Sequence, residues 1–112
     1  MRLILLLSVS VLVASIALPT DGSAQSFNCN QARTATEHAI CANRQLSNYD
    51  DQMAEDYGWI RRRLSNADQQ DLRAEQRFWL HERNRCGGDY GCLSEMYEGR
   101  ISDLEYWYSK VR

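Results

Sequence analysis

The sequence is poor in the residues that interrupt helices. Its 112 residues include a single proline, Pro19, and six glycines. No stretch alternates apolar and polar residues as a half-buried strand does, and no segment repeats. We therefore expect an all-α protein, a small disulfide-stapled antiparallel helical bundle with one short and three longer helices.

The chain also lacks a strong excess of either charge. Thirteen basic residues face 15 acidic ones, for a formal net charge of −2. A nucleic-acid-binding domain of this size normally has a marked basic excess. The balance therefore argues against a nucleic-acid partner.

The first 24 residues are typical of an export signal. Arg2 precedes an apolar run over residues 3–18, and small residues at 22–24 precede the expected cleavage point. The run is too short and too weakly flanked for a membrane span. No cysteine follows it directly, which argues against a lipid anchor. We expect residues 1–24 to be a signal peptide and residues 25–112 a single mature domain in the bacterial periplasm or outside the cell, without a membrane span.

No catalytic or metal-binding motif is recognisable. The two histidines, His38 and His81, have no accompanying nucleophile or set of ligands. A nucleophile elbow, an H-E-x-x-H string and a phosphate-binding loop are all missing. Asp51 and Glu55 are four residues apart, but a solvated helix face explains them. We predict that the protein is not an enzyme and uses no catalytic residue, cofactor or metal.

Four cysteines, Cys29, Cys41, Cys86 and Cys92, are the chain's means of reinforcing a small core. Four cysteines allow three pairings, and sequence alone does not choose between them. The spacing favours two local disulfides, one within each pair of neighbours. Zinc sites usually need closer cysteine pairs, and a redox-active C-x-x-C is missing.

Hydrophobic periodicity predicts the positions of the helices. Thr34 and Glu37 have the spacing of a capping box before a short helix over 35–42. After a turn over 43–45, a second helix is predicted over 46–64. Asn66 is a plausible N-cap for a third helix over 67–85, and a fourth should run from about 91–93 to 110. Two apolar stripes support these assignments: Leu46, Tyr49, Met53, Tyr57, Ile60 and Leu64, then Leu93, Tyr97, Ile101, Leu104, Tyr108 and Val111.

The third helix has an unusual stripe. Gln76, Trp79, Arg83 and Cys86 follow one another at spacings of three and four, so an amide and a guanidinium alternate with an indole. We favour a core position for Trp79 and a partly buried ion pair for Arg83, with Asp50 or Glu37 as its partner. The alternative is a binding surface, since Trp and Arg dominate binding hot spots.

Three strings together resemble a known family. They are F-N-C-x-x-A-x-T-x-x-E-x-A-I-C at 27–41, Q-R-x-W-L-x-x-R-x-x-C at 76–86, and R-I-x-x-L at 100–104. The combination resembles the LprI N-terminal domain family, named after a lysozyme inhibitor that is a lipoprotein. The resemblance implies a secreted helical module with local disulfides, in which Gln76, Trp79, Arg83 and Arg100 belong to the structural motif.

The resemblance also implies a function. We expect a secreted or periplasmic binding module that resembles a lysozyme inhibitor and protects the cell wall. A Gly-rich loop that a disulfide could close is the candidate binding segment, with Gly88, Asp89 and Tyr90 as its binding residues. The alternative is a non-inhibitory periplasmic structural or interaction module, which would dock another envelope protein through Trp59, Phe78 and Trp107.

Overall fold

The computed structural model describes residues 26–112, and the predicted signal peptide lies outside this range. The elements are a 3₁₀ turn η1 (Cys29–Gln31) and the helices α1 (Ala35–Ala42), α2 (Arg44–Arg61), α3 (Asn66–Asn84) and α4 (Tyr90–Ser109). No strand occurs within the described residues. The all-α fold with one short and three longer helices is therefore confirmed.

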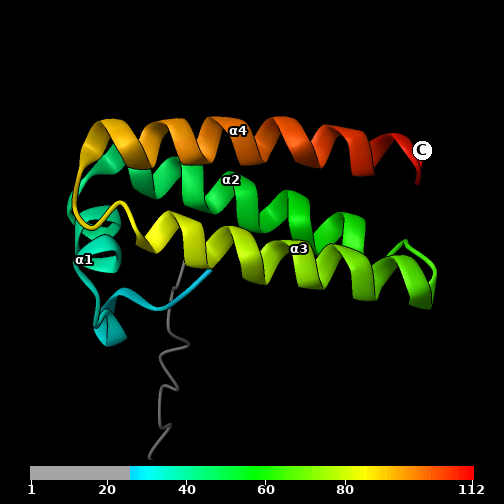
Figure 1. Ribbon diagram of the computed structural model, residues 1–112, viewed down its shortest axis with the longest axis horizontal. Coiled ribbons are helices and arrows are strands. Elements are labelled where there is room, and N and C mark those ends of the chain that lie inside the picture. The colour runs from blue at the N-terminus through cyan, green and yellow to red at the C-terminus, as the bar shows by residue number, and fades with distance from the viewer. Residues whose placement is uncertain (1–25) are drawn as a thin grey trace, which may run out of the picture.

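The three long helices lie side by side, and α1 covers one end of them (Figure 1). α3 runs antiparallel to both α2 and α4, so that α2 and α4 point in the same direction. α2 and α4 therefore begin, and α3 ends, at the end of the bundle that carries α1 and η1. We call it the α1 end. The connection between α3 and α4 lies there too.

The core consists of apolar side chains from all four α-helices. Ile40 of α1, Leu72 of α3 and Tyr97 of α4 are fully buried. The other members of this core are Leu46, Met53, Ile60, Leu64, Trp79, Leu93, Leu104 and Trp107. Since each helix buries one face, the free energy of burial holds the helices in a single arrangement.

The predicted boundaries of α2 are wrong at both ends. Asn43 is at once the C-cap of α1 and the N-cap of α2, and its side-chain oxygen accepts the Leu46 N–H at 3.1 Å. The expected turn over 43–45 is therefore reduced to one residue. At the other end α2 stops at Arg61, and Leu64 is buried beyond the helix. The apolar stripe marks which residues are buried, not where hydrogen bonding ends.

The start of α3 also differs by one residue. Ser65 is the N-cap, and its hydroxyl accepts the Asp68 N–H at 3.2 Å. Asn66, the predicted cap, is the first helical residue. Serine and asparagine cap helices about equally well, so the sequence offered no basis for choosing between neighbours.

α4 buries a slightly different face from the predicted one. Leu93, Tyr97 and Leu104 are buried as expected. Arg100 and Trp107 are buried as well, whereas Ile101 is only partly covered and Tyr108 is 43% exposed. The buried face of α4 is therefore rotated toward Arg100, a cation that a pattern of apolar residues does not include.

Candidate functional site

The candidate site is the connection between α3 and α4, residues 85–89, together with the first turn of α4. A disulfide between Cys86 and Cys92 closes it. Gly87 has a φ of 58°, a left-handed conformation that glycine adopts without steric cost. The Gly87 N–H donates to the Asn84 carbonyl at 3.2 Å, and the Asp89 N–H donates to the Cys86 carbonyl at 3.2 Å. The connection is therefore an ordered turn.

α1 fixes the connection from the other side. The Thr36 hydroxyl is buried and lies 2.6 Å from the Gly87 carbonyl oxygen and 3.3 Å from that of Asn84. A Cβ built on Gly88 would be 3.8 Å from the Ala39 Cβ, in ordinary contact distance. The N-terminal helix thus supports a segment some fifty residues further along the chain.

Asp89 ends the connection by capping α4. Its Oδ1 accepts the Cys92 N–H at 2.7 Å. Tyr90 and Gly91, which the sequence placed in a non-helical loop, are instead the first two residues of α4. Asp89 is itself an effective N-cap residue, and this local rule was overlooked. Tyr90 is 51% exposed on this first turn, and Gly88 and Asp89 are exposed beside it.

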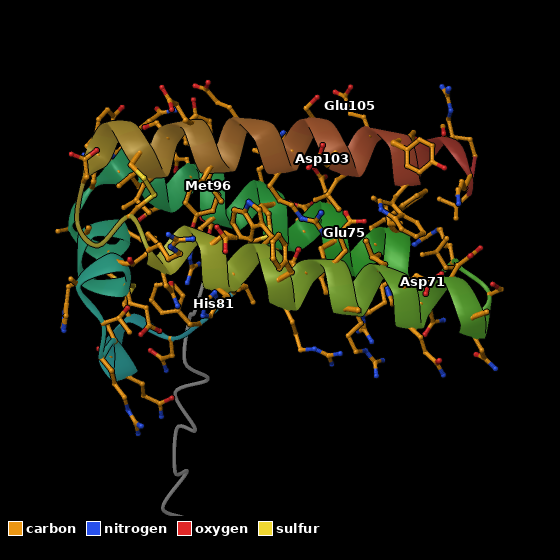
Figure 2. The ribbon with its side chains drawn as sticks, in the orientation of Figure 1. Asp71, Glu75, His81, Met96, Asp103 and Glu105 are labelled. Atoms are coloured by element: carbon orange, nitrogen blue, oxygen red, sulfur yellow. A yellow bond between two sulfur atoms is a disulfide. The ribbon has the colours of Figure 1, made fainter. Side chains whose placement is uncertain are left out.

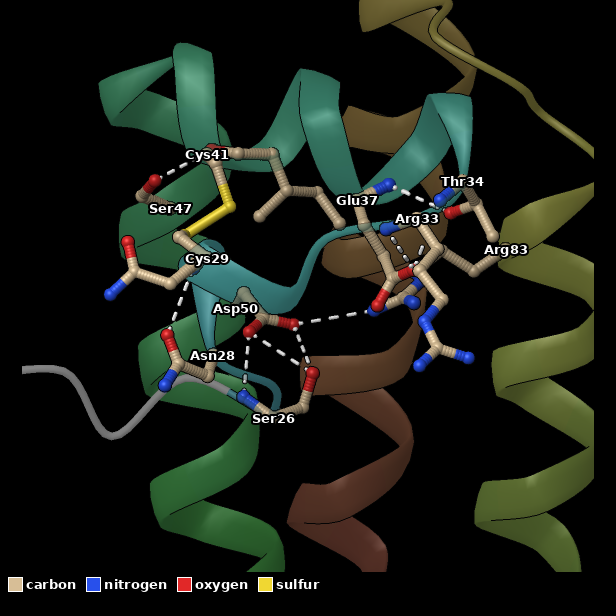
Figure 3. Close-up of a disulfide and its surroundings, with 12 residues drawn as sticks. Ser26, Asn28, Cys29, Arg33, Thr34, Glu37, Cys41, Ser47, Asp50 and Arg83 are labelled. Atoms are coloured by element: carbon tan, nitrogen blue, oxygen red, sulfur yellow. Dashed lines mark hydrogen bonds and ion pairs between the residues drawn. A yellow bond between two sulfur atoms is a disulfide. The ribbon is translucent and has the colours of Figure 1, made fainter.

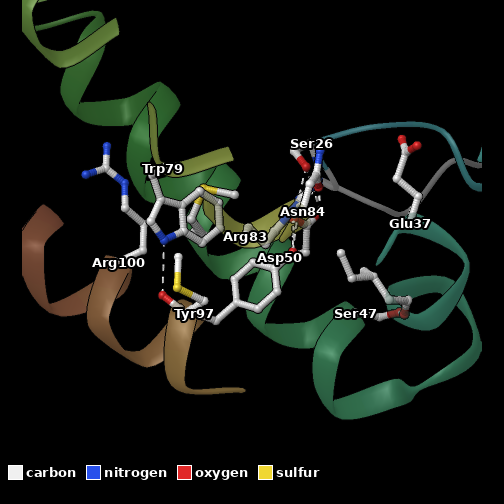
Figure 4. Close-up of polar contacts among 12 residues, drawn as sticks. Ser26, Glu37, Ser47, Asp50, Trp79, Arg83, Asn84, Tyr97 and Arg100 are labelled. Carbon is white, nitrogen blue, oxygen red and sulfur yellow. Dashed lines mark hydrogen bonds and ion pairs between the residues drawn. The ribbon is translucent and has the colours of Figure 1, made fainter. Parts of the chain in front are cut away.

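A buried polar cluster joins the C-terminal end of α3, next to the site, to α2 and α4 (Figure 4). Arg83 Nη1 lies 3.5 Å from Asp50 Oδ1 and 3.2 Å from the Tyr97 hydroxyl, which itself donates to Asp50 Oδ1 at 2.7 Å. Burial raises the pKa of Tyr97, and the negative charge of Asp50 raises it further. The phenol therefore keeps its proton and serves as a hydrogen-bond donor.

The N-terminal segment completes this cluster. The Ser26 N–H and hydroxyl donate to Asp50 Oδ2 and Oδ1 at 2.8 and 2.9 Å (Figure 3). Nearby, the second disulfide joins Cys29 to Cys41 and holds η1 against α1. Glu37, the other partner considered for Arg83, accepts from the Thr34 N–H at 3.2 Å in the expected capping box.

A second polar cluster links α3 and α4. Arg100 is 1% exposed, and its Nε donates to Gln76 Oε1 at 2.9 Å. Its Nη1 pairs with Glu75 Oε1, and the Trp107 indole N–H donates to the same carboxylate at 3.2 Å. Trp79 is also buried, and its indole N–H donates to the Met96 carbonyl at 3.1 Å. Gln76, Trp79, Arg83 and Arg100 therefore lie in the interior, away from the exposed face of the connection.

The remaining polar candidates lie apart from one another. His81 projects from the outer side of α3, with 79% of its side chain exposed, and it lies 3.8 Å from the carboxylate of Glu82 (Figure 2). His38 is exposed on α1. Within residues 26–112 no group of three or more side chains is arranged to hold a metal ion. No described helix is both long and apolar enough to cross a membrane.

The expected docking patch is not formed. Phe78 is 67% exposed on α3, but Trp107 is 7% exposed and belongs to the core. Trp59 is half-buried, with the Arg63 guanidinium 3.7 Å from its ring centroid. The prediction that Trp107 lies at the surface is wrong, because its ring packs in the core while its indole N–H donates to the partly exposed Glu75 carboxylate.

The fold and the closed connection can now be compared with known proteins. Residues 28–104 match the family described as Lysozyme inhibitor LprI. The chain belongs to this family. No curated protein and no solved structure matches it. The match spans all four cysteines and the buried Arg100, so the matched region contains both disulfides and the candidate site.

Sequence reasoning missed two contributors to the scaffold. Ser26 lies at the start of the described chain, in a polar stretch that carries no pattern. Glu75 directly precedes Gln76, the first residue of the LprI string over 76–86. This position was the only feature of the sequence that pointed to Glu75. Both act through contacts with residues far away in the sequence, and periodicity reports only on neighbours along one helix.

Proposed function

We propose that the protein binds lysozyme through the exposed face of the α3–α4 connection and inhibits it. Membership of the lysozyme-inhibitor family LprI is the observation that carries this proposal. The two disulfides indicate an oxidising compartment, and we place the protein in the periplasm or outside the cell. There it would protect the cell wall as a binding protein without catalysis of its own.

The rigidity of the connection supports its role as the binding segment. The disulfide, the Thr36 hydroxyl and the Asp89 cap each fix a different part of it. A segment that is ordered before binding does not lose conformational entropy when the complex forms. A short turn with a fixed conformation is therefore suited to binding in the cleft of an enzyme.

Tyr90 and Asp89 supply the contact chemistry. Tyr90 presents half of its surface from the first turn of a helix, and tyrosine offers a large contact area at low entropic cost. One oxygen of Asp89 is held by the Cys92 N–H, so its charge has a fixed position. We propose that this carboxylate meets basic groups beside the cleft, while Gly88 allows close approach of the enzyme's backbone.

The test is a cell-wall turbidity assay with residues 25–112 and several lysozyme types. We expect inhibition at micromolar concentration. Tyr90→Ala should weaken it about tenfold or more, as loss of a hot-spot side chain does. Asp89→Ser removes the charge but keeps a residue that caps a helix well. Any loss of inhibition in this variant can therefore be attributed to the charge of Asp89.

Tyr106→Ala is the matched control, since Tyr106 is 62% exposed on the same helix at its other end. It should inhibit as the unchanged protein does. If the unchanged protein slows no lysozyme, the inhibitor proposal fails and the non-inhibitory interaction module replaces it. If Tyr90→Ala inhibits equally well, the connection is not the binding segment.

A further inference from the structure

A groove far from the α3–α4 connection is lined by both apolar and acidic side chains. α2 and α4 line this open groove, which has a volume of about 410 Å³ and lies in the half of the bundle distant from α1. All its lining residues come from these two helices, and none from α3. Its volume is in the range of ligand-binding pockets, so it can take a large side chain and part of its neighbour.

The floor and one wall of the groove are apolar. Ile60 and Leu104 are buried at its base, and Ile101 is partly covered beside them. Trp59 and Tyr108 form an aromatic wall, with ring centroids 5.1 Å apart. These surfaces would contact methylene groups or a second apolar side chain.

The rim is acidic and its charges are unpaired. Glu55, Asp56 and Glu105 line the groove, and no cationic side chain of residues 26–112 lies within 4.0 Å of their carboxylates. Burial raises the pKa of Asp56, and the charges of Glu55 and Glu105 raise it further. The nearby Arg63 is engaged elsewhere, because it stacks on Trp59 and donates to the Trp59 carbonyl at 2.9 Å.

We propose that this groove binds an arginine side chain of a partner protein, together with an apolar residue next to it. The guanidinium would pair with the carboxylates of the rim, and the methylene stem would lie against Trp59 and Tyr108. Arginine is favoured over lysine because its planar group both pairs with carboxylates and stacks on aromatic rings. A bound metal ion is a poorer fit, because the acidic side chains of the described residues are not clustered as ligands.

The site is independent of the proposed lysozyme contact, since it lies in the other half of the bundle. A direct probe is the capped peptide acetyl-leucyl-arginyl-leucinamide, titrated into ¹⁵N-labelled residues 25–112. The indole N–H signal of Trp59 should shift and saturate with a Kd of about 1 mM or below. The signal of Trp79, buried elsewhere in the core, should stay unchanged. The same peptide with neutral citrulline in place of arginine should bind at least tenfold more weakly.

Variants separate the rim from general charge effects. Asp56→Asn combined with Glu105→Gln should weaken arginine-peptide binding tenfold or more. Asp103→Asn combined with Glu95→Gln is the matched control, because it also removes two negative charges. Both residues are exposed on α4 and neither lines the groove, although Asp103 lies near Glu105 (Figure 2). The control should bind as the unchanged protein does, and circular dichroism should show equal helicity throughout.

Several outcomes would overturn the proposal. Equal binding of the citrulline peptide would show that charge plays no part. Equal weakening by the control with Asp103→Asn and Glu95→Gln would show diffuse attraction without a site. A Trp59 signal that moves with protein concentration alone would mean that a second copy of this chain fills the groove.

Discussion

At the scale of single residues, Arg83 is the side chain whose loss should destabilise the protein most. It is 3% exposed and forms an ion pair with the fully buried Asp50. Arg83→Ala would leave the Asp50 charge buried with hydroxyl and amide partners alone. Removing one member of a buried ion pair typically costs about 3–5 kcal/mol, and we expect a loss of this size in urea unfolding at neutral pH.

Arg77→Ala is the control for this experiment, because Arg77 is exposed on the same helix. It should change the free energy of unfolding by less than about 0.5 kcal/mol. A loss below about 1 kcal/mol for Arg83→Ala would mean that solvent reaches Asp50 and compensates its charge.

The same residues show what a sequence can reveal at this scale. Arg83 was recognisable because it continues a helical stripe with Trp79, and Asp50 was one of two partners considered for it. Arg100 was left out of the predicted core face, since an apolar pattern passes over a cation. Its burial depends on Gln76 and Glu75, which α3 brings opposite it. The family resemblance placed Arg100 in the structural motif, but only the packing of two helices shows which partners surround it.

At the scale of one helix, the capping box of α1 makes stability depend on pH. Partial burial alone would raise the pKa of Glu37, but the Arg33 and Thr34 N–H groups that donate to its carboxylate outweigh this. The net pKa lies below its usual value of 4.5. A carboxyl whose pKa is lowered by folding stabilises the fold above its unfolded pKa, and this contribution is lost as the pH falls through the folded value.

We therefore expect Glu37→Gln to be less stable than the unchanged protein at neutral pH. The difference should shrink as the pH falls below 4.5. Urea unfolding of both proteins from neutral pH down to about pH 3 measures it. Glu95→Gln serves as the control, because Glu95 is exposed on α4. A difference that stays constant with pH would show that the ionised carboxylate does not support the cap.

Helix identity was easier to predict than helix ends. The capping box gave the start of α1 because Thr34 and Glu37 identify each other. The start of α4 was placed too late because glycines at 87, 88 and 91 were taken as one loop, while Asp89 caps the helix between them. A single cap residue decides such boundaries, and several residues nearby can usually play that part.

At the scale of the whole molecule, the disulfides should supply a large share of the stability. They span 12 and 6 residues. Replacing either cysteine pair with serine should cost about 2–3 kcal/mol in urea unfolding, slightly more for Cys29 with Cys41 because that loop is longer. Domains of this size have a total free energy of unfolding of about 5–15 kcal/mol. Removal of both cysteine pairs should therefore leave the folded state only marginally stable.

A cost below about 1 kcal/mol for either pair would show that the remaining contacts already fix that loop. The cysteine prediction rested on spacing and on the family resemblance. The position of the closed connection against Thr36 had no sequence signal, because the two lie 51 residues apart. The acidic groove escaped prediction for the same reason, since each of its two helices supplies only half of it.

The contacts between the N-terminal and C-terminal halves also set an order for folding as the chain is synthesised from its N-terminus. Cys29 and Cys41 are only 12 residues apart, so this disulfide can form before the C-terminal half of the chain is available. Asp50, by contrast, meets Tyr97 only after 47 more residues have emerged. Until then Asp50 can pair only with groups that precede Tyr97, such as Ser26 and Arg83, and the face of α2 that packs on α4 stays exposed. The α3–α4 connection is therefore among the last parts of the molecule to be assembled, after α4 has joined the bundle.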